Sequence, residues 1–144
     1  MTTHLPAQFQ AEVLVPGSGS GPVLVLTEPL SLWGGLNPET GEIIDRRHPQ
    51  AGQSVTNRVL VLPSGRGSSS ASSILLEAVR QGTAPTAIIT SETDGILALG
   101  AAVAREMYDR APPVLVLGPQ AYARLQTGQR VEIRADGTVL LRET

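Results

Sequence analysis

Short apolar runs alternate with helical patterns through the middle of the chain. Residues 59–62 (VLVL) form an uninterrupted branched run, which is typical of a β-strand that is covered on both faces. A turn rich in glycine and serine, residues 63–70, follows this run, and apolar residues then recur at helical spacing from Ile74 to Val79. The pattern therefore predicts a strand, a glycine turn and a helix that begins at the serines.

The same alternation continues toward the C-terminus. It predicts a strand at 86–89, a helix at 94–108, a strand at 114–117, a short helix at 120–126, and a closing hairpin of 130–134 and 138–142 around Asp136-Gly137. Ser91 and Asp94 have the spacing of a capping box at the start of the longer helix. Strands that alternate with helices in the middle, with strand pairs at both ends, indicate a mixed α/β domain.

Two strand candidates open the chain, at residues 12–15 and 23–26. The joint between them, residues 16–22 (PGSGSGP), is rich in glycine, but a strand follows it where a dinucleotide site needs a helix N-terminus. We therefore interpret the joint as a flexible hairpin connection. Residues 1–8 are expected to form a flexible tail.

A long segment with little periodicity, residues 29–56, interrupts the pattern. Loops of this length within one domain are uncommon and are usually functional or disordered. Disorder is the weaker interpretation, because the segment holds six apolar side chains that have no reason to stay exposed: Leu30, Leu32, Trp33, Leu36, Ile43 and Ile44. Part of this apolar surface is expected to contact a ligand or a partner.

Composition narrows the class of protein. The length of 144 residues suits a single domain, residues 1–144, with one core, and the 41% of hydrophobic residues are mostly aliphatic because aromatic residues make up 3%. A net charge of −2 and scattered arginines give no basic surface for nucleic acid. No apolar run is long enough to cross a membrane, and no targeting segment is evident. We expect a soluble cytoplasmic protein.

Two residue types are missing from the chain. It contains no cysteine, which excludes disulfides, thiol catalysis and any metal cluster or zinc held by its own thiolates. All eleven basic residues are arginine, which excludes a P-loop lysine, a Schiff base and a Ser/Lys dyad. A metal that the function needs must therefore come from elsewhere.

The turn at 63–70 is the strongest candidate for chemistry. Free backbone N–H groups and the positive end of the helix macrodipole meet at a helix N-terminus, so the turn is suited to an anion. Arg66 adds a permanent positive charge beside it. The serines leave two interpretations open, because Ser68, Ser69 or Ser70 can carry chemistry or can serve simply as the N-cap of the helix.

A charged cluster in the long segment is a second candidate: Asp45, Arg46, Arg47 and His48. It is interpreted either as an exposed loop or as a place where one arginine closes over a substrate or contacts a partner subunit. One histidine and one aspartate do not make a metal site. Trp33 is either a packing anchor or a platform for a ligand, and we assign Glu92 and Asp94 to the start of a helix, where acidic residues offset the dipole.

An ordered series of motifs marks the first half of the chain: residues 29–35 (PLSLWGG), 37–45 (NPETGEIID), His48-Pro49, Gly52, and 59–63 with 65–69 (VLVLP and GRGSS). The series resembles the swivel-domain subunit of the aconitase X family. The resemblance covers most of residues 10–142 and is densest between 29 and 73. It implies a swivelling β/β/α domain, with a mixed, barrel-like sheet and flanking helices, that docks on a large subunit.

This resemblance also implies an activity. It implies a dehydratase that removes water from a hydroxylated carboxylic acid and works only with a cysteine-bearing large subunit, which holds an iron–sulfur cluster as Lewis acid. In the superfamily a Gly-Ser-Ser turn supplies the proton-abstracting serine, and its match here, Gly67-Ser68-Ser69, makes Ser68 the expected base. The arginine that follows the two serines in aconitase is replaced by Ser70. We therefore expect Arg66 to bind the substrate carboxylate.

The remaining site residues come partly from this resemblance and partly from the charged and aromatic residues of the long segment 29–56. Gly67, Ser69 and Ser70 are expected to bind substrate together with Arg66, while Trp33, Arg47 and His48 are candidates for contact with the partner. Two substrates fit, cis-3-hydroxy-L-proline and mevalonate 5-phosphate, and a composition that is free of lysine and rich in alanine and arginine favours the first as the bacterial one. The alternative of another class is a non-catalytic binding or assembly module with the swivel fold.

Overall fold

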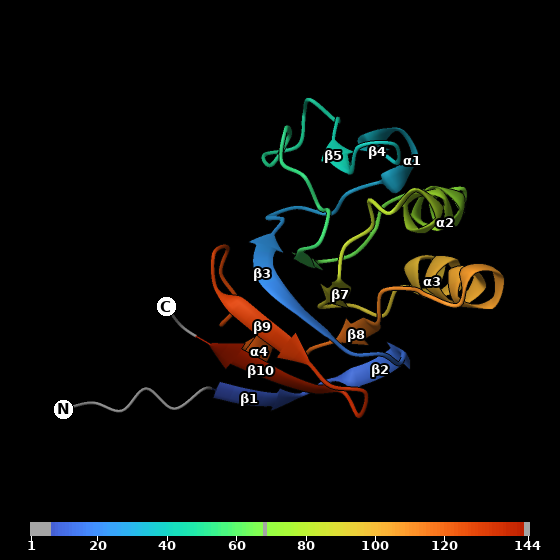
Figure 1. Ribbon diagram of the computed structural model, residues 1–144. Helices are drawn as coiled ribbons and strands as arrows, with labels where there is room; N and C mark the ends of the chain where they lie inside the picture. The colour runs from blue at the N-terminus through green and yellow to red at the C-terminus, as the bar shows by residue number, and fades with distance from the viewer. Residues whose placement is uncertain (1–6, 68, 143–144) are drawn as a thin grey trace.

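Four parallel strands form the centre of the fold in the computed structural model, which describes residues 7–67 and 69–142 (Figure 1). In spatial order they are β3 (Gly19–Val25), β6 (Val59–Leu62), β7 (Ala87–Thr90) and β8 (Val114–Val116). All four residues of β6 are buried, with Leu60 and Leu62 in one hydrophobic cluster and Val59 and Val61 in another. Burial on both faces explains the uninterrupted apolar run, as predicted.

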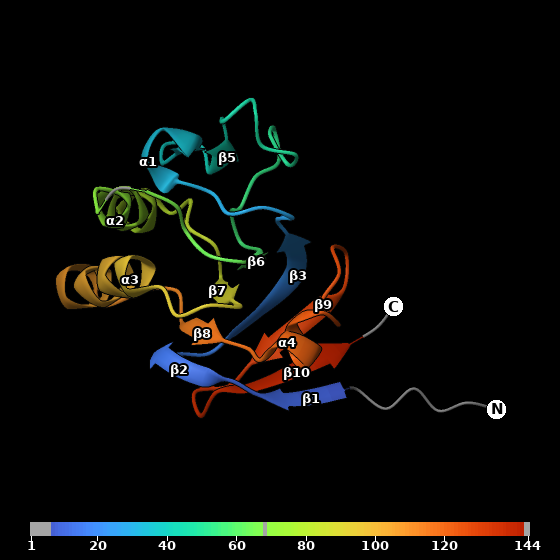
Figure 2. The ribbon, with the colours of Figure 1, turned by 180° about the vertical axis from the view of Figure 1, so that it is seen from behind.

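Helices cover one face of these parallel strands. α2 (Ala71–Gln81) and α3 (Gly95–Tyr108) pack side by side on that face in both views (Figures 1 and 2). The two helices approach closely at Gly100, where a Cβ would lie only 2.9 Å from the carbonyl oxygen of Ser72. Leu75, Ala78 and Val79 of α2 are buried, which confirms the apolar face predicted from their spacing.

Antiparallel strands extend the sheet on both sides. β9 (Arg130–Ile133), β10 (Thr138–Arg142) and β1 (Ala7–Gln10) follow β3 on one side, and β2 (Glu12–Val15) pairs with β8 on the other. β1 and β2 are separated only by Ala11, yet they occupy opposite edges of the eight-stranded sheet. The sheet must therefore curl until its edges approach each other. This nearly closed sheet with flanking helices confirms the predicted α/β fold with a barrel-like core.

The N-terminal strands do not form the hairpin predicted from the sequence. β2 pairs with β8, whereas β3 pairs with β6 and β9 and begins at Gly19, inside the joint that was expected to be flexible. A Cβ at Gly19 would lie 2.7 Å from Thr86 Cγ2, and one at Gly21 would lie 3.0 Å from the Asn57 carbonyl oxygen. The glycines therefore permit close packing within a strand and do not form a turn between two strands.

Several predicted boundaries also change. Ala7 and Gln8, expected in the tail, belong to β1 and pair with β10, while residues 1–6 lie outside the described ranges. The short helix α4 (Pro119–Tyr122) ends earlier than predicted. The closing hairpin of β9 and β10 is confirmed. No helix among the described residues is long and apolar enough to cross a membrane.

The long segment 29–56 forms a small lobe beside α2, which we call the 29–56 lobe. It contains α1 (Leu32–Gly35) and the two-stranded sheet of β4 (Leu36–Asn37) and β5 (Glu42–Ile43). Four of its six apolar side chains are buried in the core shared with α2 and α3: Leu30, Leu32, Leu36 and Ile43. Most of this apolar surface is therefore used within the chain. Trp33 and Ile44 remain at the surface, 58% and 43% exposed.

Tyr122, at the end of α4, provides a test of the core. Its hydroxyl oxygen is buried and has no hydrogen-bond partner among the described residues. We expect Tyr122→Phe to leave the free energy of unfolding unchanged or to raise it by up to about 1 kcal/mol, because the variant no longer buries an unpaired hydroxyl. Thermal unfolding beside the control Tyr108→Phe measures this. A loss of stability greater than that of the control would contradict it.

The same residue gives a pH dependence. Burial raises the pKa of the Tyr122 hydroxyl from its ordinary value of 10.0 to about 12. Because the folded chain holds this proton more tightly than the unfolded chain, the contribution of Tyr122 is complete below pH 10 and is lost as the pH rises toward 12. The Phe variant lacks this loss. It should therefore unfold at a higher pH than the wild type in an alkaline titration followed by circular dichroism.

Candidate functional site

The candidate site lies where three parallel strands end. β3 is followed by residues 26–31, β6 by the turn 63–70, and β7 by residues 91–94, and we call this region the carboxyl edge. Ligands of α/β sheets bind preferentially outside the carboxyl ends of the strands. The three segments are held together by backbone contacts, because Leu30 forms a parallel bridge with Gly65 and the Ser91 N–H donates to the Pro63 carbonyl oxygen at 3.3 Å.

One carboxylate connects the turn to α3. Asp94 Oδ2 accepts a hydrogen bond from the Gly65 N–H at 2.7 Å, and Oδ1 accepts from the N–H groups of Ile96 and Leu97, both at 3.0 Å. Asp94 is therefore the N-cap of α3 and also fixes the turn. A Cβ at Gly65 would lie 2.9 Å from Asp94 Oδ2, so glycine at this position permits the close approach.

The predicted capping box is wrong. α3 begins at Gly95 with Asp94 at the N-cap position, so Ser91 lies before the cap. The Ser91 hydroxyl donates to the Pro63 carbonyl oxygen at 3.3 Å. Asp94 is confirmed as a residue of the helix start, but its bond to Gly65, 29 positions earlier in the sequence, was not foreseen.

The turn leads directly into α2. Gly67 has a φ of +85°, a left-handed conformation that favours glycine, and Ser70 occupies the N-cap position of α2. The N–H groups of Ser72 and Ser73 donate to the carbonyl oxygens of Ser69 and Ser70 at 3.2 and 3.0 Å. An anion at this helix start would therefore be bound by groups earlier in the turn. Ser68, the expected base, lies outside the described residues.

Arg66 lines two neighbouring cavities. The smaller, of about 90 Å³, lies between the turn and the start of α3 and is also lined by Gly67 and Asp94. The larger, of about 310 Å³, is lined by Glu28, Pro29, Ser31, Asp45, Arg47, His48 and Arg66, and we call it the polar cavity. Arg66 and Arg47 are exposed, and neither guanidinium forms an ion pair or a hydrogen bond with the described part of the chain. Both are available to a ligand.

His48 is a structural member of this cavity. It is 6% exposed, its Nδ1 accepts from the Gln50 N–H at 3.1 Å, and its Nε2 lies 3.1 Å from the Glu28 carbonyl oxygen. Because Nδ1 accepts, Nε2 carries the proton and donates, so the ring is neutral and both nitrogens are used. His48 therefore ties the 29–56 lobe to the end of β3.

The other two candidates for partner contact lie at the surface. Trp33 is 58% exposed, and Arg47 is exposed and lines the polar cavity. The backbone N–H of Arg47 donates to Asp45 Oδ1 at 3.0 Å, which orders the loop that carries it. The structure thus separates the three candidates that the sequence suggested, since His48 is buried whereas Trp33 and Arg47 face solvent.

Sequence reasoning missed two residues of the polar cavity, Glu28 and Ser31. The Ser31 hydroxyl donates to the Trp33 carbonyl oxygen at 3.1 Å and lies opposite the turn, 3.7 Å from where a Cβ on Gly67 would be. The available signal was their position directly after β3, because parallel strands end at a common edge. Within residues 7–67 and 69–142, no group of three His, Asp or Glu side chains could hold a metal ion.

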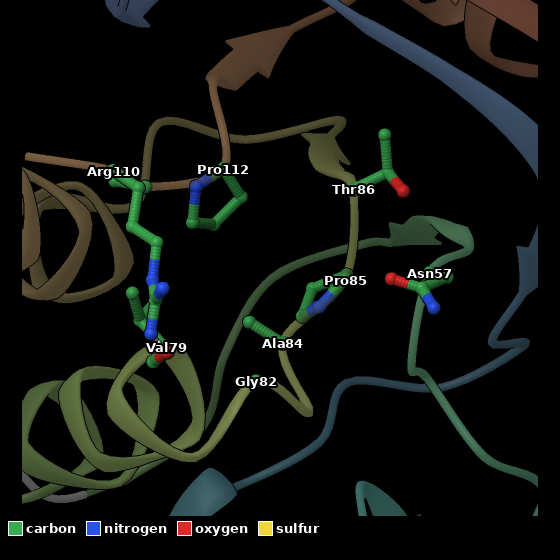
Figure 3. A pocket seen from close by; sticks show the side chains of 9 residues that line it. Asn57, Val79, Gly82, Ala84, Pro85, Thr86, Arg110 and Pro112 are labelled. Carbon is green, nitrogen blue, oxygen red and sulfur yellow. Dashed lines mark hydrogen bonds between the residues drawn. The ribbon is translucent and has the colours of Figure 1, made fainter.

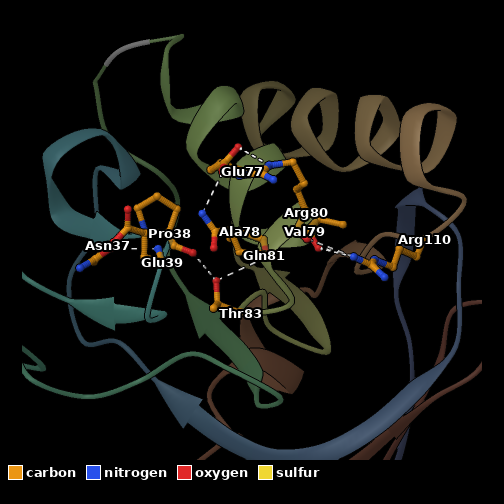
Figure 4. A network of polar contacts seen from close by, with 10 residues as sticks. All are labelled: Asn37, Pro38, Glu39, Glu77, Ala78, Val79, Arg80, Gln81, Thr83 and Arg110. Atoms are coloured by element: carbon orange, nitrogen blue, oxygen red, sulfur yellow. Dashed lines mark hydrogen bonds and ion pairs between the residues drawn. The ribbon is translucent and has the colours of Figure 1, made fainter.

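A further cavity lies at the opposite, amino ends of the strands (Figure 3). It has a volume of about 270 Å³ and is lined by residues that precede β6, β7 and β8, among them Asn57, Thr86 and Pro112. Its cation, Arg110, donates to the carbonyl oxygens of Val79 and Arg80 at 3.0 and 3.3 Å (Figure 4). Because these bonds use Arg110 to cap the C-terminus of α2, this cavity has no cation left for a ligand among its described lining residues, and the carboxyl edge is the better candidate site.

Comparison with known proteins identifies the family of the chain. Residues 8–141 match the family model described as the aconitase X swivel domain. The chain is 45% identical over 130 residues to the cis-3-hydroxy-L-proline dehydratase of Pseudomonas aeruginosa, covering 85% of this chain and 22% of that protein. It is 41% identical over 130 residues to the phosphomevalonate dehydratase small subunit of Methanothermobacter thermautotrophicus, covering 90% of this chain and 95% of that subunit.

A solved structure has the same fold. The crystal structure of the holo-form of Thermococcus kodakaraensis aconitase X superimposes with a TM-score of 0.85 and 33% sequence identity, covering 95% of this chain and 99% of that chain. The two dehydratase relatives differ in length. The chain spans 22% of the length of the Pseudomonas protein but 95% of the small subunit of Methanothermobacter thermautotrophicus.

Asp94 gives the test of this geometry. We expect Asp94→Ala to lower the free energy of unfolding by about 1 to 2 kcal/mol, because it removes a helix cap and the bond to the Gly65 N–H. Glu92→Ala is the matched control, since Glu92 is exposed and its carboxylate forms no bond with the described residues; it should change the value by less than about 0.5 kcal/mol. The free energies are measured by urea unfolding. Equal decreases for the two variants would contradict the role of the Asp94 hydrogen bonds, because they would show that removing either negative charge near the start of α3 has the same effect.

Proposed function

The chain belongs to the aconitase X swivel-domain family, and from this premise we propose that it is the small subunit of a hydro-lyase that dehydrates a hydroxylated carboxylic acid. The observation that carries the proposal is the carboxyl edge, where two cavities meet at an arginine without an internal partner among the described residues. We propose cis-3-hydroxy-L-proline as the substrate. Mevalonate 5-phosphate is the second candidate, because the chain aligns over 95% of a small subunit named for that activity.

Two residues of the turn carry the chemistry in this proposal. As its alkoxide, Ser68 takes the carbon-bound proton, the carbon–carbon double bond forms, and the hydroxyl of the neighbouring carbon leaves. The departing hydroxide gains a proton from solvent to form water, and Ser68 later returns its own proton to solvent. A serine hydroxyl is a weak base, so its alkoxide must be stabilised, and we propose that the guanidinium of Arg66 and the positive end of the α2 macrodipole do so. Arg66 binds the substrate carboxylate, with Gly67, Ser69 and Ser70 around it.

The family implies an iron–sulfur cluster, whose iron acts as a Lewis acid on the departing hydroxyl. The residues of this chain do not fit such a cluster, because the chain has no cysteine and its described residues offer no group of three other ligands. We propose that a large subunit holds the cluster and supplies its ligands. The role of this chain is then to bind the substrate and to move its proton.

The surface that faces the large subunit is proposed to be the outer side of the 29–56 lobe. Trp33 and Ile44 are large apolar side chains that stay exposed there, and the exposed Arg47 of the same lobe lines the polar cavity. Exposed aromatic residues and arginines are common at the centres of protein interfaces. A partner on this side would close the cavity from solvent.

Ser68→Ala tests the catalytic proposal. In the enzyme assembled with its large subunit, kcat should fall at least about a hundredfold, the usual scale for losing a positioned base. Stability should fall by at most about 1 kcal/mol, even where the hydroxyl contributes to the cap. Steady-state kinetics and thermal unfolding are measured together, with Ser73→Ala, an exposed serine of α2, as the control. Turnover close to the wild type, or activity lost only through unfolding, would overturn the role of Ser68.

Trp33 tests the proposed interface. It is the only tryptophan, so a small subunit that contains 5-fluorotryptophan gives one ¹⁹F resonance. We expect this resonance to shift when the unlabelled large subunit binds, and Trp33→Ala to raise the dissociation constant at least about tenfold. Met107→Ala, equally exposed at 59% but on α3, is the matched control. An unchanged resonance in an active complex would place the interface elsewhere.

A further inference from the structure

The polar cavity contains opposite charges that do not neutralise each other. Glu28, Asp45, Arg47 and Arg66 all line it, and the ion pairs of the described residues lie elsewhere, at Arg80 and at Glu132. In a surface site that serves stability alone, such groups would be expected to pair within the chain. Here the four residues line a common volume of about 310 Å³ that is large enough for a small ligand.

The bonds of the cavity leave both carboxylates available. Only the backbone carbonyl of Glu28 is used, by His48 Nε2, and its exposed side chain forms no bond with the described residues. Asp45 Oδ1 accepts from the Arg47 N–H, which leaves Oδ2 unused by the described residues. His48 adds no charge, because its Nδ1 accepts a hydrogen bond and the ring is neutral. Two guanidinium groups and two carboxylates therefore give the cavity a formal net charge of zero.

A neutral cavity with separated charges matches a zwitterion. We propose that the polar cavity selects an amino acid as substrate, with Arg66 and Arg47 binding its carboxylate and Glu28 and Asp45 binding its ammonium group. A phosphorylated hydroxy acid brings a carboxylate and a phosphate and no cation, so it leaves the two carboxylates of the cavity facing like charges. The inference rests on the proposed function and identifies the residues that choose between its two substrates.

Two unreactive ligands separate ammonium recognition from carboxylate recognition. L-Proline has both charged groups, whereas cyclopentanecarboxylate has the same ring size and carboxylate but no nitrogen. Binding of each to the complex with the large subunit is measured by calorimetry, which does not require turnover. Glu28→Gln and Asp45→Asn should each lower the affinity for L-proline at least about tenfold and the affinity for cyclopentanecarboxylate less than about twofold, because only the partner of the ammonium group is lost.

Control variants come from the same lobe. Glu42→Gln removes an exposed carboxylate outside the polar cavity and should change neither affinity. Arg47→Gln should lower the affinity for both ligands by a similar factor. Arg46 is the exposed neighbour of Arg47 and lies outside the cavity, so Arg46→Gln should change neither affinity. A merely structural role of Glu28 or Asp45 would lower both affinities together. Thermal unfolding confirms that each variant is folded.

The outcomes separate this inference from the proposed function. Equal losses for both ligands in Glu28→Gln and Asp45→Asn, or a higher kcat/KM of the wild type for mevalonate 5-phosphate than for cis-3-hydroxy-L-proline, would overturn selection of an amino acid and leave the dehydratase proposal standing. A wild-type complex that dehydrates neither acid would refute the dehydratase proposal, while the binding measurements would still decide whether the cavity recognises an amino acid.

Discussion

The fold depends on one topological constraint, the single residue between two strands at opposite edges of the sheet. Ala11 separates β1 from β2, so the sheet has to curl before both strands can pair. Curling encloses one hydrophobic cluster on the inner side and leaves the other side for α2 and α3. The parallel pairing of β3, β6 and β7 places their carboxyl ends at one edge, where every residue of the candidate site follows a strand end or belongs to the lobe packed beside it.

The carboxyl edge is held by contacts between segments that are distant in sequence. Asp94 fixes Gly65 to the start of α3, the Leu30 bridge to Gly65 brings the 29–56 lobe to the turn, and Thr83 Oγ1 donates to the Pro38 carbonyl oxygen at 2.6 Å at the other end of α2 (Figure 4). The lobe is therefore attached at both ends of α2. A site held in this way binds its ligand with little ordering of its own, which is the advantage of preorganisation.

Local patterns were predictable and long-range contacts were not. The strand at 59–62, the helix that follows the serines and the turn between them depend on neighbouring residues, so hydrophobic period and turn composition were sufficient. The prediction of a turn at the glycines of 17–21 is wrong, because a glycine needed for close packing and a glycine needed for a turn look the same in a sequence. The bond from Asp94 to Gly65 and the place of Glu28 in the polar cavity depend on which strands are parallel neighbours, which composition does not reveal.

The distribution of arginine partners argues that the carboxyl edge is built for something other than stability. Seven of the eleven arginines have a partner within the described residues: Arg58, Arg80, Arg105, Arg110, Arg124, Arg134 and Arg142. The side chains of the other four form no hydrogen bond, ion pair or ring contact with the described residues, and three of them, Arg46, Arg47 and Arg66, belong to the turn or the 29–56 lobe. A chain without lysine or cysteine has few groups that can recognise an anion. It leaves cations unpaired where the segments of the proposed site converge, and a ligand or a partner there would supply the missing negative charge.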